Sequence, residues 1–199
     1  MDEIMDKATD NDEAAVNDKV MVNTEKSKKY FKPFMLTALI IIVDQVSKAF
    51  ISIKWPGYGL IKDIFSNDFL LIYHVRNKAI AFSLGENIPE GPFRQLLFVV
   101  APLFVLAFLV WYYFKSDEFS RLQRWAIAGI IGGGLGNIID RVFRKDGVVD
   151  FISVKLYGLF GMERWPTFNA ADSSVVICCL LLLATMIKPE KEAINEQKI

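Results

Sequence analysis

The stretch Leu96–Phe114 reads LLFVVAPLFVLAFLVWYYF and holds nineteen residues without a charged side chain. A bilayer core of about 30 Å needs a helix of roughly 20 mostly apolar residues. Pro102 inside the stretch is compatible with this, because membrane helices tolerate proline. Trp111, Tyr112 and Tyr113 form an aromatic belt of the kind found at membrane–water interfaces. The stretch therefore predicts a transmembrane helix.

Three other segments approach the same length with few charges, so we expect the chain to cross the membrane four times. The predicted spans cover residues 34–53, 94–114, 123–141 and 168–187. A chain of 199 residues is too short for two full domains of this kind, so we expect one membrane-embedded unit over residues 34–189. The predicted fold class is an all-α membrane protein, a four-transmembrane-helix bundle.

The two ends of the chain are polar. Residues 1–33 are mixed in charge and lack a short apolar core with a small-residue cleavage site, so we expect a disordered cytoplasmic extension and not a signal peptide. Residues 190–199 are expected to form a cytoplasmic tail. The whole chain has 23 basic and 23 acidic residues, which gives no broad basic field of the kind that nucleic acid requires. We therefore expect no nucleic-acid partner.

The orientation is predicted from the basic residues near the spans. An even number of spans puts both termini on one side, and basic residues gather before span one and between spans two and three, which favours the cytoplasm for both regions. They are Lys26, Lys28, Lys29, Lys32, Lys115, Arg121 and Arg124. The region between spans three and four also holds basic residues, so the count alone is nearly balanced. These are Arg141, Arg144, Lys145, Lys155 and Arg164.

With cytoplasmic termini, two longer segments lie outside, at about 54–92 and 142–167. The first contains the β-prone run Phe69–Val75, which is followed after a polar patch by Ala79–Leu84. Short runs rich in aromatic and β-branched residues and separated by polar residues are typical of hairpins. We expect a small hairpin or sheet at the membrane surface.

Ionisable groups inside the predicted spans are informative, because each is costly there unless it is paired or faces a wet cavity. Asp44 and Lys48 stand four residues apart on one face of span one, with the acid before the base, which is the favourable order for an ion pair on a helix. A structural pair that anchors span one against its neighbours and a functional role are equally good interpretations.

Span three ends in a polar cluster after a run of glycines. Gly132–Gly136 lacks the ending of a P-loop and the context of a dinucleotide fingerprint, so close packing between membrane helices is the better interpretation. Asn137, Asp140 and Arg141 follow at spacings of three and four, which places them on one helix face. Such a cluster can hold a neighbouring loop or a substrate.

Asp150 and Asp172 are the candidate catalytic pair. Asp150 is flanked by apolar residues, and Asp172 shares a helix face with Asn169 at the start of span four. Either acid alone could be a helix cap or a surface acid. Two carboxylates in a poorly hydrated pocket share a proton, so one can act as a base toward water while the other polarises a carbonyl. This chemistry cuts a peptide bond without a metal or cofactor, and we expect neither.

Other classes of protein fit less well. His74 is the only histidine, which excludes a histidine-rich zinc site, and we expect it to be a packed or interfacial residue. Cys178 and Cys179 are adjacent in an apolar run, where they are best interpreted as small apolar helix residues. A small transporter would use the intramembrane charges as an ion path, but it predicts an inverted repeat that the sequence lacks. A non-catalytic scaffold would use them only to lock helices together.

Five motifs, taken together and in this order, resemble one known family. They are Asp44-Gln-Val-Ser-Lys48, Asn77-Lys-Ala-Ile-Ala-Phe-Ser83, Gly132-Gly-Gly-Leu-Gly-Asn-Ile-Ile-Asp-Arg141, Val148-Val-Asp-Phe-Ile152 and Phe168-Asn-Ala-Ala-Asp172. The family is bacterial lipoprotein signal peptidase, or signal peptidase II. Single motifs of this kind are weak, but the ordered set with four spans is specific.

The resemblance implies more than the residues alone. It implies a small extracytoplasmic β-sheet and a short surface helix beside the bundle, in a monomer of the bacterial inner membrane. It also implies an aspartic endopeptidase that removes the signal peptide from prolipoproteins, cutting before a cysteine that bears a diacylglyceryl group. The expected partners are this diacylglyceryl-modified prolipoprotein and membrane lipids, and the antibiotic globomycin is expected to block the reaction.

Residue roles follow from the matched positions. Asp150 and Asp172 look like the catalytic pair, and Asp44 and Lys48 match a structural polar pair. The residues expected to bind substrate or support the site are Asn77, Gly133, Asn137, Asp140, Arg141 and Asn169. No metal ligand is expected among them.

Two departures from the family pattern concern the outer segments. Ala79 stands where the family usually has glycine, so the local turn is expected to differ. The connection from Asp150 to Asp172 is longer than the family's, which affects the shape of that outer loop. Neither departure removes a catalytic group.

Overall fold

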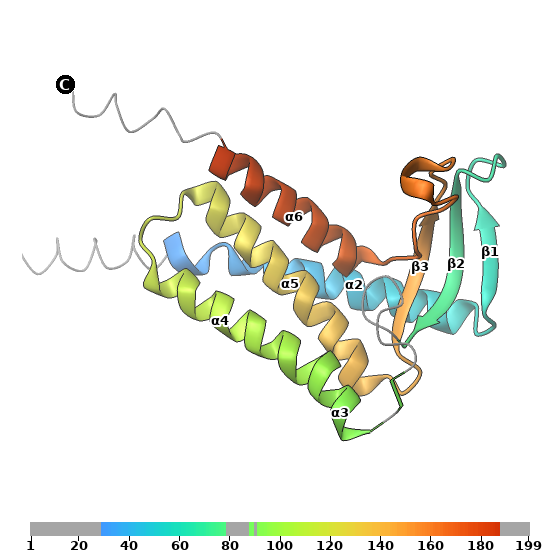
Figure 1. Ribbon diagram of the computed structural model, residues 1–199, viewed down its shortest axis with the longest axis horizontal. Coiled ribbons are helices and arrows are strands. Elements are labelled where there is room, and N and C mark those ends of the chain that lie inside the picture. Colours follow the sequence, from blue (N-terminus) through green and yellow to red (C-terminus); the bar gives the residue numbers. More distant parts are fainter. Residues whose placement is uncertain (1–28, 79–87, 90, 188–199) are drawn as a thin grey trace, which may run out of the picture.

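The computed structural model describes residues 29–78, 88–89 and 91–187. Within them, four helices are long and apolar enough to cross a membrane, which confirms the predicted bundle (Figure 1). They cover Lys29–Lys54, Pro92–Lys115, Arg121–Phe143 and Ala170–Ile187. Most of the predicted N-terminal extension and the whole predicted tail at 190–199 lie outside the described residues.

The spans are built from helices of different regularity. Span one is α2 (Phe34–Lys54), span three is α5 (Arg121–Phe143) and span four is α6 (Ala170–Ile187). Span two runs from the short α3 (Pro92–Gln95) through a π-helical segment (Leu96–Val100) into α4 (Ala101–Lys115). The π-helical segment ends at Val100, and Pro102 follows as the second residue of α4, where proline cannot donate the backbone hydrogen bond that a regular helix requires.

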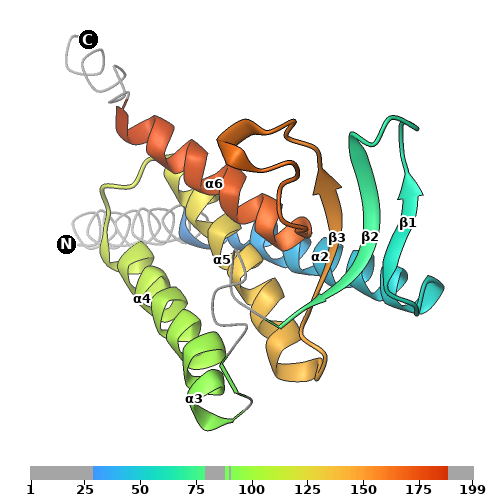
Figure 2. The ribbon, with the colours of Figure 1, turned by 45° about the vertical axis from the view of Figure 1, so that its right-hand side comes forward.

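Helix α5 is the centre of the bundle and contacts α2, α4 and α6 (Figure 2). In its most apolar window 61% of residues are buried, against 11–22% in the other three spans. Its glycines allow this close approach. A Cβ atom on Gly132 would lie 3.1 Å from the Cα of Thr37 in α2, and one on Gly133 would lie 2.5 Å from the carbonyl oxygen of Ala171 in α6. Small residues therefore bring both partner helices onto α5.

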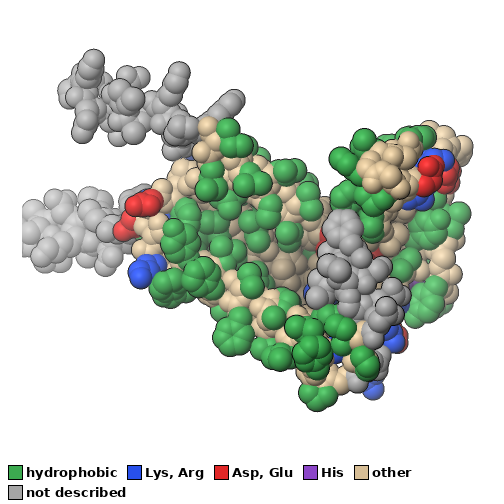
Figure 3. All heavy atoms as spheres, in the orientation of Figure 1, with side chains coloured by type: hydrophobic (Ala, Val, Ile, Leu, Met, Phe, Trp, Pro, Cys, Tyr) green, Lys and Arg blue, Asp and Glu red, His purple; other side chains and the backbone are tan. Residues whose placement is uncertain are grey.

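The outer faces of the bundle are apolar. Hydrophobic side chains cover the visible surface of the bundle in Figure 3. In α4, Phe104 and Phe108 are 72% and 62% exposed, and Leu180 in α6 is 61% exposed. Exposed apolar surface on this scale is typical of a protein whose solvent is lipid.

A buried arginine stabilises the turn between α4 and α5 through hydrogen bonds to backbone carbonyl groups. Arg124 donates to the carbonyl oxygens of Tyr113 at 3.2 Å and Ser116 at 2.8 Å, and its guanidinium lies over the ring of Tyr30 at 4.3 Å. Ser120 begins α5 with a reciprocal cap in which its hydroxyl accepts from the backbone of Gln123. The basic residue that helped predict the orientation is thus also a structural one.

A three-stranded antiparallel sheet stands at one end of the bundle, in the order β1 (Gly59–Asp63), β2 (Leu70–Asn77), β3 (Val148–Val154). The predicted strand at Phe69–Val75 is confirmed as β2. Its partners are β1 and β3, whereas Ala79–Leu84, the partner considered from sequence, lies outside the described residues. Strand β3 was not predicted, because its pairing with β2 joins segments more than 70 residues apart.

Strand β3 packs on the end of α2. Val149 and Phe151 form an apolar cluster with Ile51 of α2, and Trp55 closes its edge. His74 in β2 is buried, and its Nδ1 lies 2.6 Å from the carbonyl oxygen of Trp55. The histidine therefore has a packing position, as the sequence indicated.

Span four begins two residues later than predicted, at Ala170. Phe168 remains extended because its backbone pairs with Ile152 of β3, with N–H to O distances of 2.8 and 2.9 Å. Asn169 then caps the helix. This pairing draws the start of α6 against β3.

The close approach of α5 and α6 predicts a difference between adjacent glycines. A Cβ on Gly133 would meet backbone, whereas one on Gly134 would meet only the terminal methyl groups of Leu106 at 2.9 Å. We expect Gly133→Ala to lower the free energy of unfolding by about 1–3 kcal/mol, the usual cost of overpacking. Gly134→Ala should cost much less. Thermal unfolding in detergent measures both, and equal stability of the two variants would contradict the packing described.

Candidate active site

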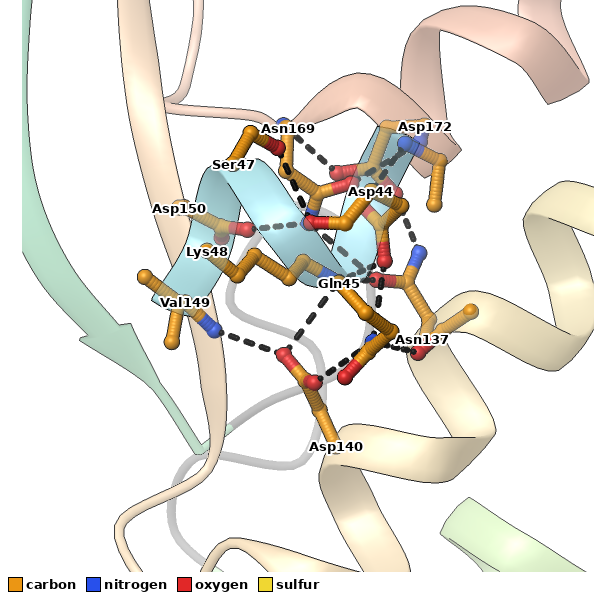
Figure 4. Close-up of polar contacts among 12 residues, drawn as sticks. Asp44, Gln45, Ser47, Lys48, Asn137, Asp140, Val149, Asp150, Asn169 and Asp172 are labelled. Atoms are coloured by element: carbon orange, nitrogen blue, oxygen red, sulfur yellow. Dashed lines mark hydrogen bonds and ion pairs between the residues drawn. The ribbon is translucent and has the colours of Figure 1, made fainter. Parts of the chain in front are cut away.

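Asp150 and Asp172 meet where the sheet joins the bundle. Asp150 is the third residue of β3 and Asp172 the third residue of α6, and the pairing of Phe168 with Ile152 brings the two elements together. Asn169 contacts both acids, as Figure 4 shows. Its Nδ2 donates to Asp150 Oδ1 at 2.7 Å, and its backbone N–H donates to Asp172 Oδ2 at 3.1 Å.

The start of α6 is a reciprocal cap that also orients one acid. Asn169 Oδ1 accepts from the backbone N–H of Asp172 at 3.0 Å, while Asp172 Oδ2 accepts from the backbone of Asn169. This is the capping-box arrangement, which satisfies two backbone donors that the first helical turn leaves free. Helix initiation therefore holds the Asp172 carboxylate in place.

Two further asparagines complete the hydrogen bonding of the acids. Asn77 Nδ2 of β2 donates to Asp150 Oδ2 at 2.9 Å, and Asn137 Nδ2 of α5 donates to Asp172 Oδ1 at 2.8 Å. Together with Asn169, these give each of the four carboxylate oxygens an N–H donor. The structure thus brings three predicted site residues, all amides, around the acid pair.

Lys48 supports this arrangement through Asn137. Its Nζ donates to Asn137 Oδ1 at 2.9 Å, and the same oxygen accepts from Asn169 Nδ2 at 3.1 Å. Because Asn137 Oδ1 is occupied by donors, its Nδ2 must turn toward Asp172. The side chain of Asn137 thus links Lys48 to Asp172 through two hydrogen bonds.

Lys48 is also the centre of a fully buried ion cluster. Its Nζ lies 2.8 Å from Asp44 Oδ2 and 3.2 Å from Asp140 Oδ2, and all three side chains are 0% exposed. Asp44 Oδ1 accepts from the backbone N–H of Ala171 at 3.0 Å, and Asp140 Oδ2 accepts from that of Val149 at 3.1 Å. Ala171 directly precedes Asp172 and Val149 directly precedes Asp150, so the cluster fixes the backbone beside each acid.

Two members of the cluster were not singled out from the sequence. Gln45 Nε2 lies 3.1 Å from Asp44 Oδ2 and 3.0 Å from Asp140 Oδ1, and Arg144 Nε donates to the same Asp140 oxygen at 3.0 Å. The spacing of Asp140 and Arg144, four residues on one helix, was a usable signal. Gln45 carried none, because it directly follows Asp44, and adjacent helical residues do not face one another.

The polar cluster predicted at the end of α5 divides between two places. Asn137 and Asp140 enter the buried network, whereas Arg141 lines a neighbouring cavity of about 340 Å³ that Asn77 also lines. The cavity is also lined by basic side chains, which are Lys78, Arg94, Arg141, Arg144 and Lys145. Gly133 supports the site differently, by letting Ala171 pack against α5.

The environment of Asp150 favours its protonated form. Burial, and after it the nearby charge of Asp172, raises the pKa of Asp150 to about 7, although hydrogen bonds from Asn77 and Asn169 act in the opposite direction. A carboxyl group that titrates near neutral pH can hold a proton or release it under physiological conditions. The pair can therefore offer an acid and a base together.

Removing the Lys48 charge should be strongly destabilising. Lys48→Met leaves Asp44 buried without a cation and Asp140 with Arg144 alone, a loss of about 3–5 kcal/mol for a broken buried pair. Lys54→Met is the matched control, because Lys54 ends the same helix at an exposed position over the rings of Phe50 and Trp55. Chemical unfolding in detergent compares them. Equal stability of the two variants would contradict a central role for the cluster.

Comparisons with known proteins agree with the fold and the motifs. The family model described as Signal peptidase (SPase) II matches residues 36–188. The lipoprotein signal peptidase of Treponema denticola is 47% identical over 160 residues, covering 80% of this chain and 91% of the relative. That of Treponema pallidum is 41% identical over 173 residues, covering 85% and 90%.

A solved structure gives the same result in three dimensions. A bacterial membrane enzyme determined by the in meso method at 2.3 Å resolution superposes with a TM-score of 0.67 and 28% sequence identity. The match covers 84% of this chain and 94% of that one. With the family model matching most of its length, the chain belongs to the signal peptidase II family of membrane proteases.

Proposed function

We propose that this protease is an aspartic endopeptidase that removes the signal peptide from prolipoproteins, cutting before a diacylglyceryl-modified cysteine, with Asp150 and Asp172 as its catalytic pair. The curated relatives named above are lipoprotein signal peptidases. The observation that carries the proposal is the position of Asn169, which donates to both acids and so holds them on either side of one residue.

The proposed reaction uses the two acids in different protonation states. Asp150 holds the shared proton up to about pH 7, in keeping with its pKa of about 7, and Asp172 acts as the base. Asp172 accepts a proton from water as the water oxygen attacks the scissile carbonyl carbon, and Asp150 donates to the carbonyl oxygen. The tetrahedral intermediate collapses as Asp172 returns its proton to the leaving amide nitrogen and Asp150 regains its own. Atoms and charges balance over the cycle.

The three asparagines orient the carboxyl groups of this pair. The amides of Asn77 and Asn169 orient the Asp150 carboxyl group, and burial together with the charge of Asp172 outweighs the lowering of its pKa by their hydrogen bonds. Arg141 and Asn77 line the adjoining cavity, where polar side chains can hold the backbone of an extended substrate. We assign Asn77, Asn137 and Asn169 to orientation of the pair and Arg141 to the substrate side.

The position of the pair suits a lipid-anchored substrate. Asp172 lies two residues into α6, about 3 Å along the axis at 1.5 Å per residue, so the scissile bond would be cut close to the membrane surface. We propose that the signal helix lies beside the bundle while its lipid tails stay in the outer leaflet. In this arrangement both termini are cytoplasmic and the sheet lies at the extracytoplasmic face of the inner membrane.

Substitution of either acid tests the catalytic pair. Asp150→Asn or Asp172→Asn should reduce cleavage of a purified diacylated precursor by at least about 10³-fold, because neither variant can both hold and accept the proton. Asp146→Asn is the matched control, an exposed acid in the turn before β3, and should cleave normally. Gel mobility of the precursor, with and without globomycin, is the readout. Full activity in Asp150→Asn or Asp172→Asn would exclude the dyad.

The pKa of Asp150 predicts the alkaline limb of the pH profile. Because the reaction needs Asp150 protonated, kcat/KM should fall as pH rises above about 7, approaching tenfold per pH unit. Asn77→Ala removes a hydrogen bond that lowers this pKa, so the limb should move to higher pH. Initial rates across a pH series measure both. A limb that stays in place, or that moves to lower pH, would contradict the assignment of the proton.

A further inference from the structure

The connection between β3 and α6 exposes large apolar side chains outside the four spans. Tyr157, Leu159 and Phe160 are 66%, 55% and 78% exposed. They lie in and beside the 3-10 helix Leu159–Gly161, which is one turn long. Exposure of three such residues within four positions is unfavourable in water and is typical of a surface that binds something apolar.

The backbone of this turn adopts an unusual conformation. Tyr157 and Phe160 have φ values of 52° and 57°, in the left-handed region that bulky residues rarely adopt, and Gly158 and Gly161 have φ values of 83° and 73°. Most of the surface of the Tyr157 and Phe160 side chains is exposed, so neither is packed into the sheet. We call Tyr157, Leu159 and Phe160 the apolar turn.

The base of the apolar turn is held firmly. Lys155 Nζ and Arg164 Nη1 contact the Asp68 carboxylate at 2.9 and 3.1 Å, and the backbones of Lys155 and Arg164 pair with each other. The backbone N–H of Lys155 also donates to the carbonyl oxygen of Phe69 at 2.9 Å. Both strands of the loop are therefore fixed to the β1–β2 hairpin, which leaves the turn as a rigid projection.

The projection lies outside the four helices that are long and apolar enough to cross a membrane. Figures 1 and 2 both show it on the side of the sheet that faces the bundle. In Figure 3, hydrophobic side chains gather on that side of the sheet, across a notch from the apolar outer surface of the bundle. This side of the sheet thus adds apolar surface next to that of the bundle.

We propose that the apolar turn inserts into the headgroup–acyl boundary of the bilayer that the bundle spans. Its aromatic and aliphatic side chains suit that boundary, and the Lys155 ammonium 5.4 Å from the centre of the Tyr157 ring places a polar group just above it. The turn belongs to the connection between Asp150 and Asp172, so its insertion would set the depth of the acid pair relative to the lipid surface. The inference rests on the membrane-spanning bundle and not on the catalytic roles.

Depth measurement by spin labelling tests this. Phe160→Cys and, separately, Leu159→Cys are made in a full-length Cys178→Ala/Cys179→Ala chain, labelled with a nitroxide and reconstituted into vesicles of phosphatidylcholine with a minor share of phosphatidylglycerol. Relaxation by dissolved oxygen and by a water-soluble nickel chelate is then compared. Lys62→Cys, at an exposed position of the edge strand β1, is the aqueous control.

Both turn labels should be relaxed several-fold more by oxygen than by the nickel chelate, and the Lys62→Cys label should show the reverse. Nickel accessibility at the turn equal to that at Lys62→Cys would overturn the proposal. Low accessibility to both reagents together with dipolar broadening would also overturn it, because a second copy of the chain would then cover the turn. Cleavage activity does not enter the readout, so failure of the catalytic proposal would leave the result unaffected.

Discussion

The buried ammonium of Lys48 is the interaction on which the rest of the structure depends. Three charged side chains with no solvent exposure are stable only if their remaining hydrogen-bonding capacity is used. Asp44 and Asp140 use it on the backbone N–H groups of Ala171 and Val149. One cation thus connects α2, α5, β3 and α6, and fixes the chain next to both members of the acid pair. An apolar replacement could fill the same space but could not orient these two segments.

The ion cluster and the acid pair use different hydrogen-bond donors. Lys48, Asp44 and Asp140 pair with one another in the ion cluster. The acid pair accepts hydrogen bonds from the amides of Asn77, Asn137 and Asn169. Asn137 connects the ion cluster with the acid pair, because its Oδ1 accepts a hydrogen bond from Lys48 while its Nδ2 donates one to Asp172. A lysine bonded directly to a carboxylate would favour full ionisation of the pair. The intervening amide transmits orientation and weakens the field, so that one proton can be retained.

Features set by length, polarity and helical spacing were predictable from the sequence. The four spans followed from apolar length, the close packing of α5 from its glycines, and the ion pair of Asp44 and Lys48 from their spacing. Features set by long-range backbone pairing were not. No local pattern indicated that β3 pairs with β2, or that Phe168 would stay extended against Ile152 and delay the start of α6. The acids were predicted as a pair, but the backbone bonds that place them became visible only in the fold.

The sharing of one proton between Asp150 and Asp172 is the central claim, and infrared spectroscopy tests it most directly. The carbonyl stretch of a protonated carboxylic acid is distinct from the bands of a carboxylate, and isotope labelling of aspartate assigns it. We predict an aspartic acid band in the protein in bilayers below pH 7 that fades as the pH rises through about 7 and is absent from Asp150→Asn. A spectrum with no protonated aspartate on the acid side of neutrality, or with a band that Asp150→Asn leaves unchanged, would contradict the claim.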